Sequence, residues 1–387
     1  MRILVAALES PTPVVDGASL RLFHLLAELR HRHALHVVCY GRALTLDGVT
    51  STVLEAPAPR ATGTRLLRAA RSLVSEPALA QATRTGALSA AVAEAGRAGL
   101  YDVAHLSGAA SSVLAESLPD IPCVWDTIDT WHVSRAEEAR AESFPRSQLL
   151  RAGSLSIRRF ERDALQRVRA TTVTSRSDRE ALLDVSPAAR VEVVPNGVDA
   201  DYFSRPAEVR VDPLLIAFHG NLSYSPNADA ARFLARDVLP QVAAAVPGAR
   251  LRLIGRNPPA DVRALAAENV EVTGEVDDVR PALAEAAVVA CTVRTGTGIK
   301  NKLLEAAALG LPIVATSAAV GDLDLRDGEQ LLVRDGADCI AEAVAKLLAD
   351  PKRRDTLGVA ARSAVLDGWT WPRAASSFER LYDEIRR

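Results

Sequence analysis

Short apolar runs of strand type alternate with helical patterns from one end of the chain to the other, and no other feature limits the fold as strongly. The first strand pattern covers residues 2–8 and leads through a polar loop to a helical pattern over 19–32. A second strand pattern follows at 33–40. Beyond Pro206 the alternation starts again, with a strand pattern over 214–219. Such alternation is typical of parallel α/β sheets, so the sequence predicts two α/β halves.

The length and composition of the chain agree with two globular domains. A chain of 387 residues is too long for one ordinary domain, and we place the two at 1–205 and 206–368. The net charge of −2 gives no indication of nucleic acid as a partner. Four widely spaced cysteines without a CxxC pair fit a reducing cytoplasm. No apolar run reaches the roughly 18 residues needed to cross a bilayer, so we expect a cytoplasmic protein, soluble or peripheral at the inner face of the membrane.

One stretch, TGTGIKNKLLEAAALGLPIVAT over 295–316, has the pattern of a ligand-binding βαβ unit. Gly296 and Gly298 follow an apolar strand pattern and remove side chains where a backbone must approach a ligand closely. The composition from Ile299 to Leu309 is helical. A helix N-terminus offers unpaired N–H groups and a partial positive charge, so this end of the helix favours a phosphate.

The lysines strengthen the prediction of an anion site. The whole chain has four, and two of them, Lys300 and Lys302, lie in the first turn of this helix. Cations at a helix N-terminus oppose the helix dipole, and a bound anion would remove that conflict. The alternative is that both lysines are solvated and that the glycines only shape a turn.

Other nucleotide-binding patterns fit less well. No GxxxxGK[ST] occurs, and the glycines of 295–298 lack the third glycine and the acidic residue of a dinucleotide-binding fingerprint. The remaining candidate is another ligand that carries phosphate. Glu305 lies at i+3 from Lys302 and at i+4 from Asn301, so these three residues share one helix face. Its carboxylate can accept hydrogen bonds from sugar hydroxyls, or it can form an intrahelical salt bridge.

Several other residues are candidates on weaker grounds. His105 lies near the end of one strand pattern and Asp126 at the end of another, where each is either a general base or a core side chain. The Asp322-Leu-Asp324 sequence resembles a metal-binding DxD motif, but we interpret it as structural and expect no metal site. Three arginines spaced by three residues suggest either a basic helix on an anionic membrane or a solvated face. They are Arg65, Arg68 and Arg71.

Taken together, these motifs resemble glycosyltransferase family 4, whose members are retaining enzymes of GT-B architecture. The resemblance covers nearly the whole chain. It is carried by GTGIKNKLLEAAALGLPIVAT (296–316), VVPNGVDADYF (193–203) and HGNLSYSPNADAARFL (219–234). The last of these is similar to the GxxxYxPNxDA loop of one subgroup. The resemblance implies an α/β fold with two Rossmann-like, doubly wound parallel-sheet domains that face a central cleft.

The implied reaction is transfer of a sugar from a nucleotide diphosphate sugar to a glycan, a lipid-linked or a small-molecule acceptor, with retention and without a metal or other cofactor. Glu305 corresponds to the glutamate that contacts the ribose, while Lys300, Lys302 and Arg294 would neutralise the diphosphate. The predicted catalytic residues are Lys302, His105 and Asp126. The predicted donor-binding residues are Gly17, Gly220, Asn221, Arg294, Gly296, Thr297, Gly298, Ile299, Lys300, Asn301, Lys302 and Glu305.

Two departures from the family pattern bear on the donor. The first glutamate of the family's E-x7-E pair is replaced by Thr297, which implies an altered contact with the donor sugar. The segment 219–227 lacks the arginine and lysine that usually follow the first strand of the C-terminal domain, so Lys300 and Lys302 would have to supply that charge.

The resemblance also assigns the tail of the chain. Residues 369–387 match the helix that crosses back onto the N-terminal domain in this family, although an ordinary C-terminal helix is the alternative. Two rival functions stay open at this point: an inverting GT-B transferase that decorates a natural product, and a non-catalytic protein that binds a sugar nucleotide.

Overall fold

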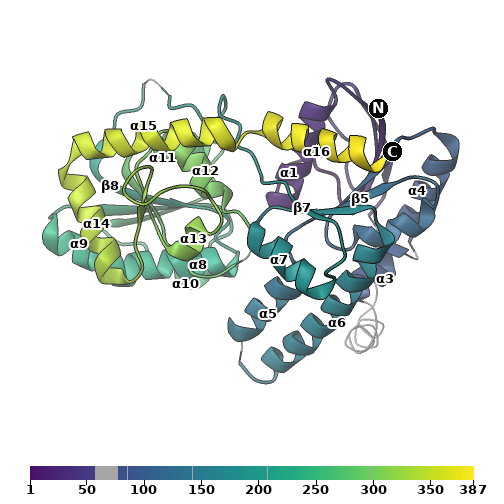
Figure 1. The fold of residues 1–387 in the computed structure, drawn as a ribbon. Helices are drawn as coiled ribbons and strands as arrows, with labels where there is room; N and C mark the ends of the chain where they lie inside the picture. Colours follow the sequence, from purple (N-terminus) through teal and green to yellow (C-terminus); the bar gives the residue numbers. More distant parts are fainter. Residues whose placement is uncertain (57–76, 85, 142, 207, 297) are drawn as a thin grey trace. The chain divides into compact units, whose positions relative to one another are not determined.

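The chain forms two compact units (Figure 1). The N-terminal unit consists of Met1–Asn196 and Trp371–Arg387, and the C-terminal unit of Gly197–Thr370. The sequence pattern had placed these boundaries at 205/206 and 368/369. The computed structural model describes residues 1–56, 77–84, 86–141, 143–206, 208–296 and 298–387.

The N-terminal unit contains a seven-stranded sheet in the order β3-β2-β1-β4-β5-β6-β7, and its recorded strand pairs are parallel. Its strands are β1 (Arg2–Ala7), β2 (Ala34–Tyr40), β3 (Val49–Leu54), β4 (Val103–Ser107), β5 (Cys123–Ile128), β6 (Ala170–Val173) and β7 (Val191–Val193). Its helices are α1 (Gly17–Leu29), α3 (Ala78–Arg84), α4 (Ala87–Ala98), η1 (Ser111–Ser117), α5 (Trp131–Ala141), α6 (Arg146–Arg167), α7 (Arg176–Val185) and α16 (Trp371–Ile385).

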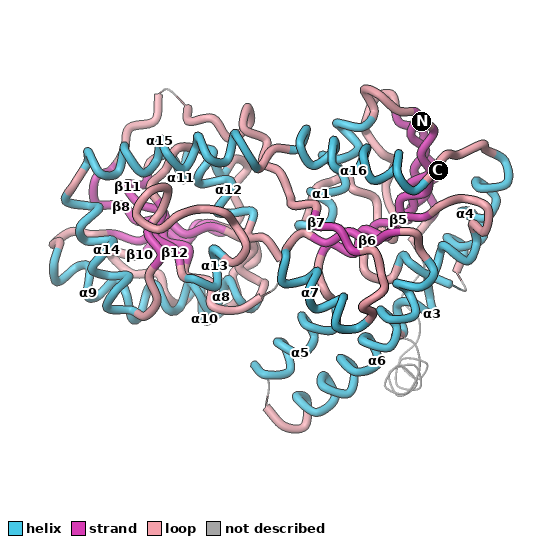
Figure 2. The backbone as a smooth tube through the Cα atoms, viewed as in Figure 1, coloured by secondary structure: helices cyan, strands magenta, loops and turns pink. Residues whose placement is uncertain are grey.

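Both faces of this sheet are covered because its central strands are apolar on both sides. Along β1, Ile3, Val5 and Ala7 pack into one cluster, while Leu4 and Ala6 pack into another, as the two-residue period of a strand requires. Helices α1 and α16 contribute to the first cluster, and α4, η1, α6 and α7 to the second. Figure 2 shows α1 and α16 on one side of the strands and α6 and α7 on the other.

The last helix of the chain is part of the N-terminal unit. Helix α16 packs against α1, and its Trp371, Phe378 and Tyr382 side chains are buried in the cluster that these two helices share. This arrangement is the crossover that the family resemblance implied for residues 369–387, and it contrasts with an ordinary C-terminal helix on the second unit.

The C-terminal unit contains a six-stranded sheet in the order β10-β9-β8-β11-β12-β13, again with parallel pairs. Its strands are β8 (Asp212–His219), β9 (Arg250–Ile254), β10 (Val270–Gly274), β11 (Ala286–Cys291), β12 (Ile313–Ala315) and β13 (Leu332–Val333). Its helices are α8 (Ser225–Phe233), η2 (Leu234–Val238), α9 (Leu239–Ala245), α10 (Ala260–Arg263), α11 (Val279–Ala284), α12 (Asn301–Ala308), α13 (Ser317–Val320), α14 (Ala337–Ala349) and α15 (Pro351–Gly368).

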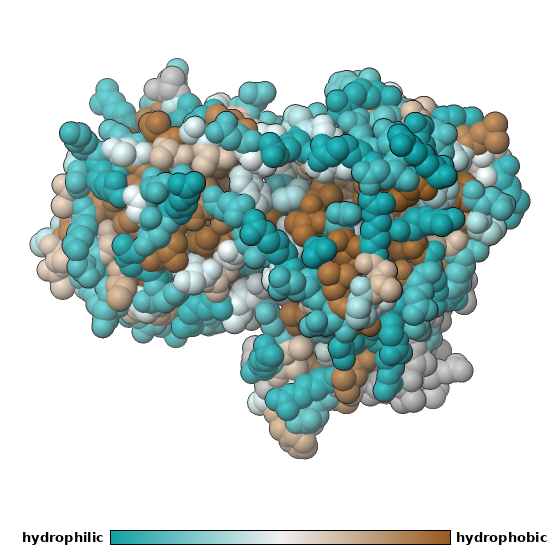
Figure 3. Space-filling view, viewed as in Figure 1, coloured by the Kyte–Doolittle hydropathy of each residue, from teal (hydrophilic) through white to brown (hydrophobic). Residues whose placement is uncertain are grey.

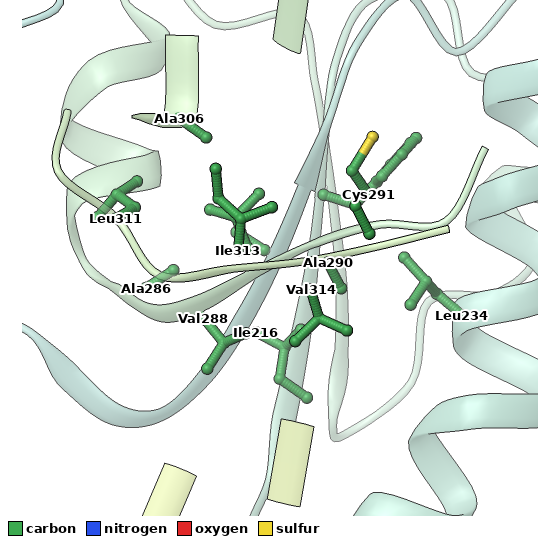
Figure 4. Close-up of a cluster of buried hydrophobic side chains, with 14 of the residues drawn as sticks. Ile216, Leu234, Ala286, Val288, Ala290, Cys291, Ala306, Leu311, Ile313 and Val314 are labelled. Carbon is green, nitrogen blue, oxygen red and sulfur yellow. The ribbon is translucent and has the colours of Figure 1, made fainter. Parts of the chain in front are cut away.

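One continuous hydrophobic core fills the C-terminal unit. Ile216, Val288 and Val314 project from three neighbouring strands toward one side of the sheet, whereas Ala306 of α12 lies on the other side, toward which Ile313 points (Figure 4). Strand β11 is buried along its whole length. Because both faces of such a strand are apolar, the strand is fixed in place, and it holds the loop that follows it at a defined position on the sheet edge.

The surfaces carry polar side chains over most of the face in view, for example on the α5–α6 pair, whose tip is more apolar (Figure 3). Among the described residues, no helix combines the length and the apolar character that crossing a membrane requires.

Candidate functional site

The carboxyl ends of β8 and β11 lie side by side in the C-terminal sheet, because these two strands pair in parallel. The loop after β8 leads into α8, and the loop after β11 leads into α12. Both helices therefore begin at the same edge of the sheet. This edge is where ligands bind in open α/β sheets, and the free N–H groups of a helix N-terminus favour an anion there.

Lys302 connects the two loops. Its Nζ donates a hydrogen bond to Oδ1 of Asn227 in α8, and the Asn227 amide donates to the carbonyl oxygen of Asn221 at 2.8 Å. The ammonium also lies 5.2 Å from the centroid of the Phe218 ring. Burial lowers the pKa of Lys302 below the ordinary lysine value, despite the opposing effects of Cys291 and Glu305. A partly buried cation of this kind is stabilised when an anion binds beside it.

Gly220 leaves the space that the Lys302 ammonium needs. Its φ is +151°, and a Cβ at this position would lie 2.9 Å from Nδ2 of Asn227 and 3.2 Å from Nζ of Lys302. Any larger residue would therefore strain the backbone and displace the lysine. The sequence had selected Gly220 and Asn221 by family position alone, and the structure gives both a contact with this lysine network.

Glu305 is held by a histidine. Oε2 of Glu305 lies 2.8 Å from Nε2 of His219, the last residue of β8. The intrahelical salt bridge with Lys302, which the spacing allowed, is absent from the ion pairs of the described residues. The carboxylate instead faces the same sheet edge as the lysine.

Lys300 connects two backbone carbonyl groups of the glycine loop that precedes α12. Its Nζ donates to the carbonyl oxygens of Gly296 at 2.7 Å and Gly298 at 3.1 Å. Gly296 has a φ of +104°, and a Cβ there would lie 3.3 Å from the hydroxyl of Tyr224. Lys300 thus shapes the loop, in addition to any charge that it offers to a ligand. Thr297 lies outside the described residues.

Arg294 is engaged with α8. Its guanidinium forms a bidentate pair with Asp229, with N–O distances of 2.8 and 2.9 Å, and lies 4.6 Å from the Phe233 ring centroid. Ile299 packs against the hydrophobic core, and Asn301 is the first residue of α12. A diphosphate role for Arg294 would require the Asp229 pair to open or to be shared.

Gly17 belongs to the N-terminal unit. It is the first residue of α1, and Asp16 caps the helix by accepting from the Ser19 backbone N–H at 2.8 Å. A Cβ at position 17 would meet no atom within 4 Å. The protein itself therefore gives no packing reason for a glycine here.

Asp126 and His105 lie in a buried polar network of the N-terminal unit. Arg21, which is fully buried in α1, donates to both oxygens of Asp126 at 2.8 and 3.0 Å and to Oδ1 of Asn196 at 2.8 Å. His105 Nδ1 lies 2.7 Å from the hydroxyl of Tyr382 in α16. Both side chains are engaged with buried partners, although Nε2 of His105 has no hydrogen-bond partner among the described residues, and the catalytic roles predicted for Asp126 and His105 stay predictions.

The electrostatics of this network agree with a structural role. Burial alone would raise the pKa of Asp126, but the charge and hydrogen bonds of Arg21 outweigh burial and hold that pKa below its ordinary value. Burial lowers the pKa of His105 to about 4. At neutral pH the network therefore contains an ionised carboxylate paired with Arg21 and an uncharged imidazole.

Sequence patterns missed three of the residues that matter here. Arg21 could have been found, because a charged residue stands on the apolar stripe of its helix with Leu25 and Leu29. His219 and Asn227 gave no such signal, since their partners, Glu305 and Lys302, lie at least 75 residues away along the chain.

Comparison with known proteins decides the family. The family model described as Glycosyltransferase Family 4 matches residues 15–202, and the model described as Glycosyl transferases group 1 matches residues 213–350. The chain belongs to the family 4, group 1 glycosyltransferases. Within this glycosyltransferase family, the subgroup suggested by the segment 219–234 stays a prediction.

Curated relatives of this glycosyltransferase chain include mannosyltransferases. It is 29% identical to the GDP-mannose-dependent alpha-(1-6)-phosphatidylinositol monomannoside mannosyltransferase of Mycolicibacterium smegmatis, over 58% of this chain and 63% of that protein. It is 28% identical to the MMP alpha-(1->4)-mannosyltransferase of Mycolicibacterium hassiacum, over 78% of this chain and 75% of that protein. The match thus covers just under two thirds of the first relative and three quarters of the second.

Solved structures confirm the GT-B fold. The sucrose-phosphate synthase of Thermosynechococcus elongatus superimposes with a TM-score of 0.73 over 99% of this chain and 98% of that chain, at 17% identity. HepE of Anabaena, in complex with UDP and glucose, gives a TM-score of 0.70 over 98% of this chain and 99% of that chain, at 14% identity. At such identities the likeness concerns the fold alone.

Proposed function

We propose that this protein transfers a sugar from a nucleoside diphosphate sugar to an acceptor, with retention of the anomeric configuration. The observation that carries the proposal is that a partly buried lysine, Lys302, and a carboxylate held by a histidine, Glu305, lie where α8 and α12 begin together. Family membership and the names of the relatives support it.

The proposed roles follow from charge and position. Cleavage of the donor's C1–O bond leaves negative charge on the departing diphosphate, and the ammonium of Lys302 together with the N-terminal N–H groups of α12 would stabilise that charge. Glu305 would accept hydrogen bonds from the ribose hydroxyls. We assign no step to His105 or Asp126, because both are buried among other side chains.

GDP-mannose is the first donor to test, because the M. smegmatis relative is named as GDP-mannose-dependent. The acceptor is proposed to be a glycan or a lipid-linked glycan at the cytoplasmic face of the membrane, since that relative acts on a phosphatidylinositol mannoside by name. A small-molecule acceptor would instead fit the rival reaction that inverts the anomeric centre, and the anomeric configuration of the product distinguishes the two.

Calorimetric titration with a panel of nucleoside diphosphates tests the donor site. We expect one base to bind and Lys302→Ala to weaken that binding by about tenfold or more, because a charge-assisted contact contributes roughly 1.5–3 kcal/mol. Lys346→Ala is the matched control, since this lysine is exposed on α14 and pairs with Glu342. The proposal fails if no nucleoside diphosphate binds the wild type. Binding without transfer or hydrolysis across a broad acceptor screen would favour the non-catalytic rival.

The sugar specificity is proposed to depend on position 297, where the family pattern has a glutamate and this chain has threonine. We expect Thr297→Glu to change the ratio of kcat/KM values between donors that differ in one sugar hydroxyl, because a carboxylate can accept a hydrogen bond that threonine cannot reach. Competition assays with pairs of donors measure this ratio. An unchanged ratio would argue against a donor contact at this residue.

We also propose that the N-terminal unit contacts an anionic membrane surface. The arginines predicted for this contact, Arg65, Arg68 and Arg71, lie outside the described residues. A second basic surface, here termed the α6 face, lies on the exposed side of α6. It consists of Arg151, Leu155, Arg158, Arg159 and Arg162.

The α6 face has the charge that an anionic surface requires. Its four arginines recur at helical spacing, and only Arg162 has an exposed acidic neighbour, Asp163 at 3.8 Å, among the ion pairs of the described residues. Part of the face borders a cavity of about 420 Å³ between α6 and the end of α7. Exposed Leu155 lies among the arginines, as is typical of helices at membrane surfaces.

A further inference from the structure

His219 occupies an unusual position for a residue at the end of a central strand. Its ring is buried, with the side chain 5% exposed, and its Nε2 faces a carboxylate oxygen of Glu305, whose side chain is 20% exposed. The next residue, Gly220, leaves space for the Lys302 ammonium. Two consecutive residues of the β8 end therefore contact the two charged groups of the site.

The second ring nitrogen of His219 shows which tautomer is present. Nδ1 is buried and has no hydrogen-bond partner among the described residues. Because Nε2 faces a carboxylate, it must carry the hydrogen, and a hydrogen on Nδ1 would be buried without an acceptor. The ring therefore acts as a hydrogen-bond donor directed at Glu305.

Without the hydrogen bond from His219, the Glu305 carboxylate would have another partner close by. Lys302 lies three residues earlier on the same helix, within reach of a direct ion pair. Such a pair would neutralise the ammonium and turn the carboxylate toward it. In the structure, Asn227 accepts from Lys302 and His219 donates to Glu305, so the two charges have separate partners.

We infer that His219 is a positioning residue that keeps the Glu305 carboxylate away from Lys302 and oriented toward the ribose of the donor. This inference rests on the proposed function. Oε2 of Glu305 accepts from His219, and Oε1, which has no partner among the described residues, remains for a ribose hydroxyl. Lys302 then forms no ion pair with Glu305, and its ammonium remains available to the diphosphate.

Two substitutions separate the hydrogen-bond donor of His219 from the rest of its side chain. In His219→Gln the amide nitrogen comes close to the position of Nε2 and can still donate to Glu305. In His219→Asn the amide lies near the position of Nδ1 and cannot reach the carboxylate. The ligands are the nucleoside diphosphate that binds best, its 2′,3′-dideoxy analogue and inorganic pyrophosphate.

We expect His219→Asn to weaken binding of the nucleoside diphosphate by about tenfold and binding of the dideoxy analogue and pyrophosphate by a smaller factor, because all three ligands meet an ammonium partly neutralised by Glu305 but only the first also loses a ribose contact. His219→Gln should retain wild-type affinity for all three. Equal loss of all three ligands in His219→Asn would indicate general distortion of the site and would overturn the inference.

The Glu305→Ala variant distinguishes failure of this inference from failure of the proposed function on which it rests. If Glu305→Ala abolishes the preference for ribose over dideoxyribose and His219→Asn does not, the proposed function stands and the inference fails. If Glu305→Ala itself leaves that preference intact, the ribose contact in the proposed function is wrong. The double variant His219→Asn, Glu305→Ala should bind no more weakly than Glu305→Ala, since both changes remove the same contact.

Discussion

Lys302 shows how burial and charge act together at a single residue. The chain uses arginine almost everywhere, yet the residue that connects α8 and α12 is a lysine. Its ammonium lies so near Gly220 that a Cβ on the glycine would be 3.2 Å from Nζ. Its pKa is lowered by burial, so its charge is less secure than that of a surface lysine.

This lowered pKa predicts a pH dependence of ligand binding. Only the protonated amine attracts a diphosphate, so affinity should fall as pH rises, beginning at lower pH than for a lysine with the ordinary pKa of 10.5. Titrations above about pH 8, where the ligand's phosphates are ionised, measure this loss. An affinity that stays constant to pH 10 would contradict the prediction. Lys302→Ala is the control, because without this amine the fall in affinity over this range should be smaller.

His105 predicts a pH dependence of stability. Burial lowers its pKa from 6.5 in the unfolded chain to about 4 in the folded protein. The stabilisation is therefore complete above pH 6.5 and is lost as pH falls toward 4, by about 3 kcal/mol in total. His105→Asn retains a polar group near the Tyr382 hydroxyl but cannot titrate. Thermal unfolding at pH 7 and 4.5 should show a smaller loss for this variant, and an equal loss would refute the assignment.

At the scale of elements, local sequence determined the strands and helices well. The predicted strand at 2–8 is β1 (Arg2–Ala7), and the predicted helix at 299–309 is α12 (Asn301–Ala308), because apolar periodicity and the glycines around 298 and 310 act over a few residues. Side-chain partners were not predictable in the same way. The Glu305–His219 contact and the burial of Asp126 beside Arg21 depend on which strand ends become neighbours.

Helix α6 carries the prediction for membrane contact. We expect the triple variant Arg151→Gln, Arg158→Gln, Arg162→Gln to bind vesicles containing phosphatidylglycerol at least tenfold more weakly than the wild type, because arginines near an anionic surface contribute additively. Vesicle sedimentation at low and high salt measures this binding, which should weaken with salt. Vesicles of phosphatidylcholine alone should not bind.

The control for this experiment removes equal charge elsewhere. Arg236, Arg263 and Arg326 are exposed on the C-terminal unit, and their replacement by glutamine should leave vesicle binding unchanged. If the α6 variant and this control lose binding equally, attraction is due to overall charge, and the α6 face has no special role.

At the scale of the whole molecule, the two units are joined by two neighbouring segments. Val198 forms a parallel bridge with Thr370, and its backbone N–H donates to the carbonyl oxygen of Trp369 at 2.9 Å. Asn196, at the end of the first segment, accepts from Arg21, and Trp371, at the end of the second, stacks on His24. Both connections are therefore anchored on α1.

Removal of α16 tests the contribution of the tail. A chain that ends at residue 370 leaves the surface beneath Trp371, Phe378 and Tyr382 exposed, and the burial of each such side chain contributes about 1.5–3 kcal/mol. We expect this truncated protein to lose most of the stability of its N-terminal unit and to aggregate, while the C-terminal unit stays folded. Limited proteolysis with mass spectrometry identifies the surviving fragment. A protected fragment of residues 1–196 would refute this expectation.

The return of α16 to the N-terminal unit also sets an order for synthesis on the ribosome. Residues 197–370 complete the C-terminal unit while the tail that the N-terminal unit needs has not yet been made. The unit that comes second in the sequence is thus the first whose residues are all present. The N-terminal unit must wait for the last residues of the chain, with its apolar α16 site uncovered until then.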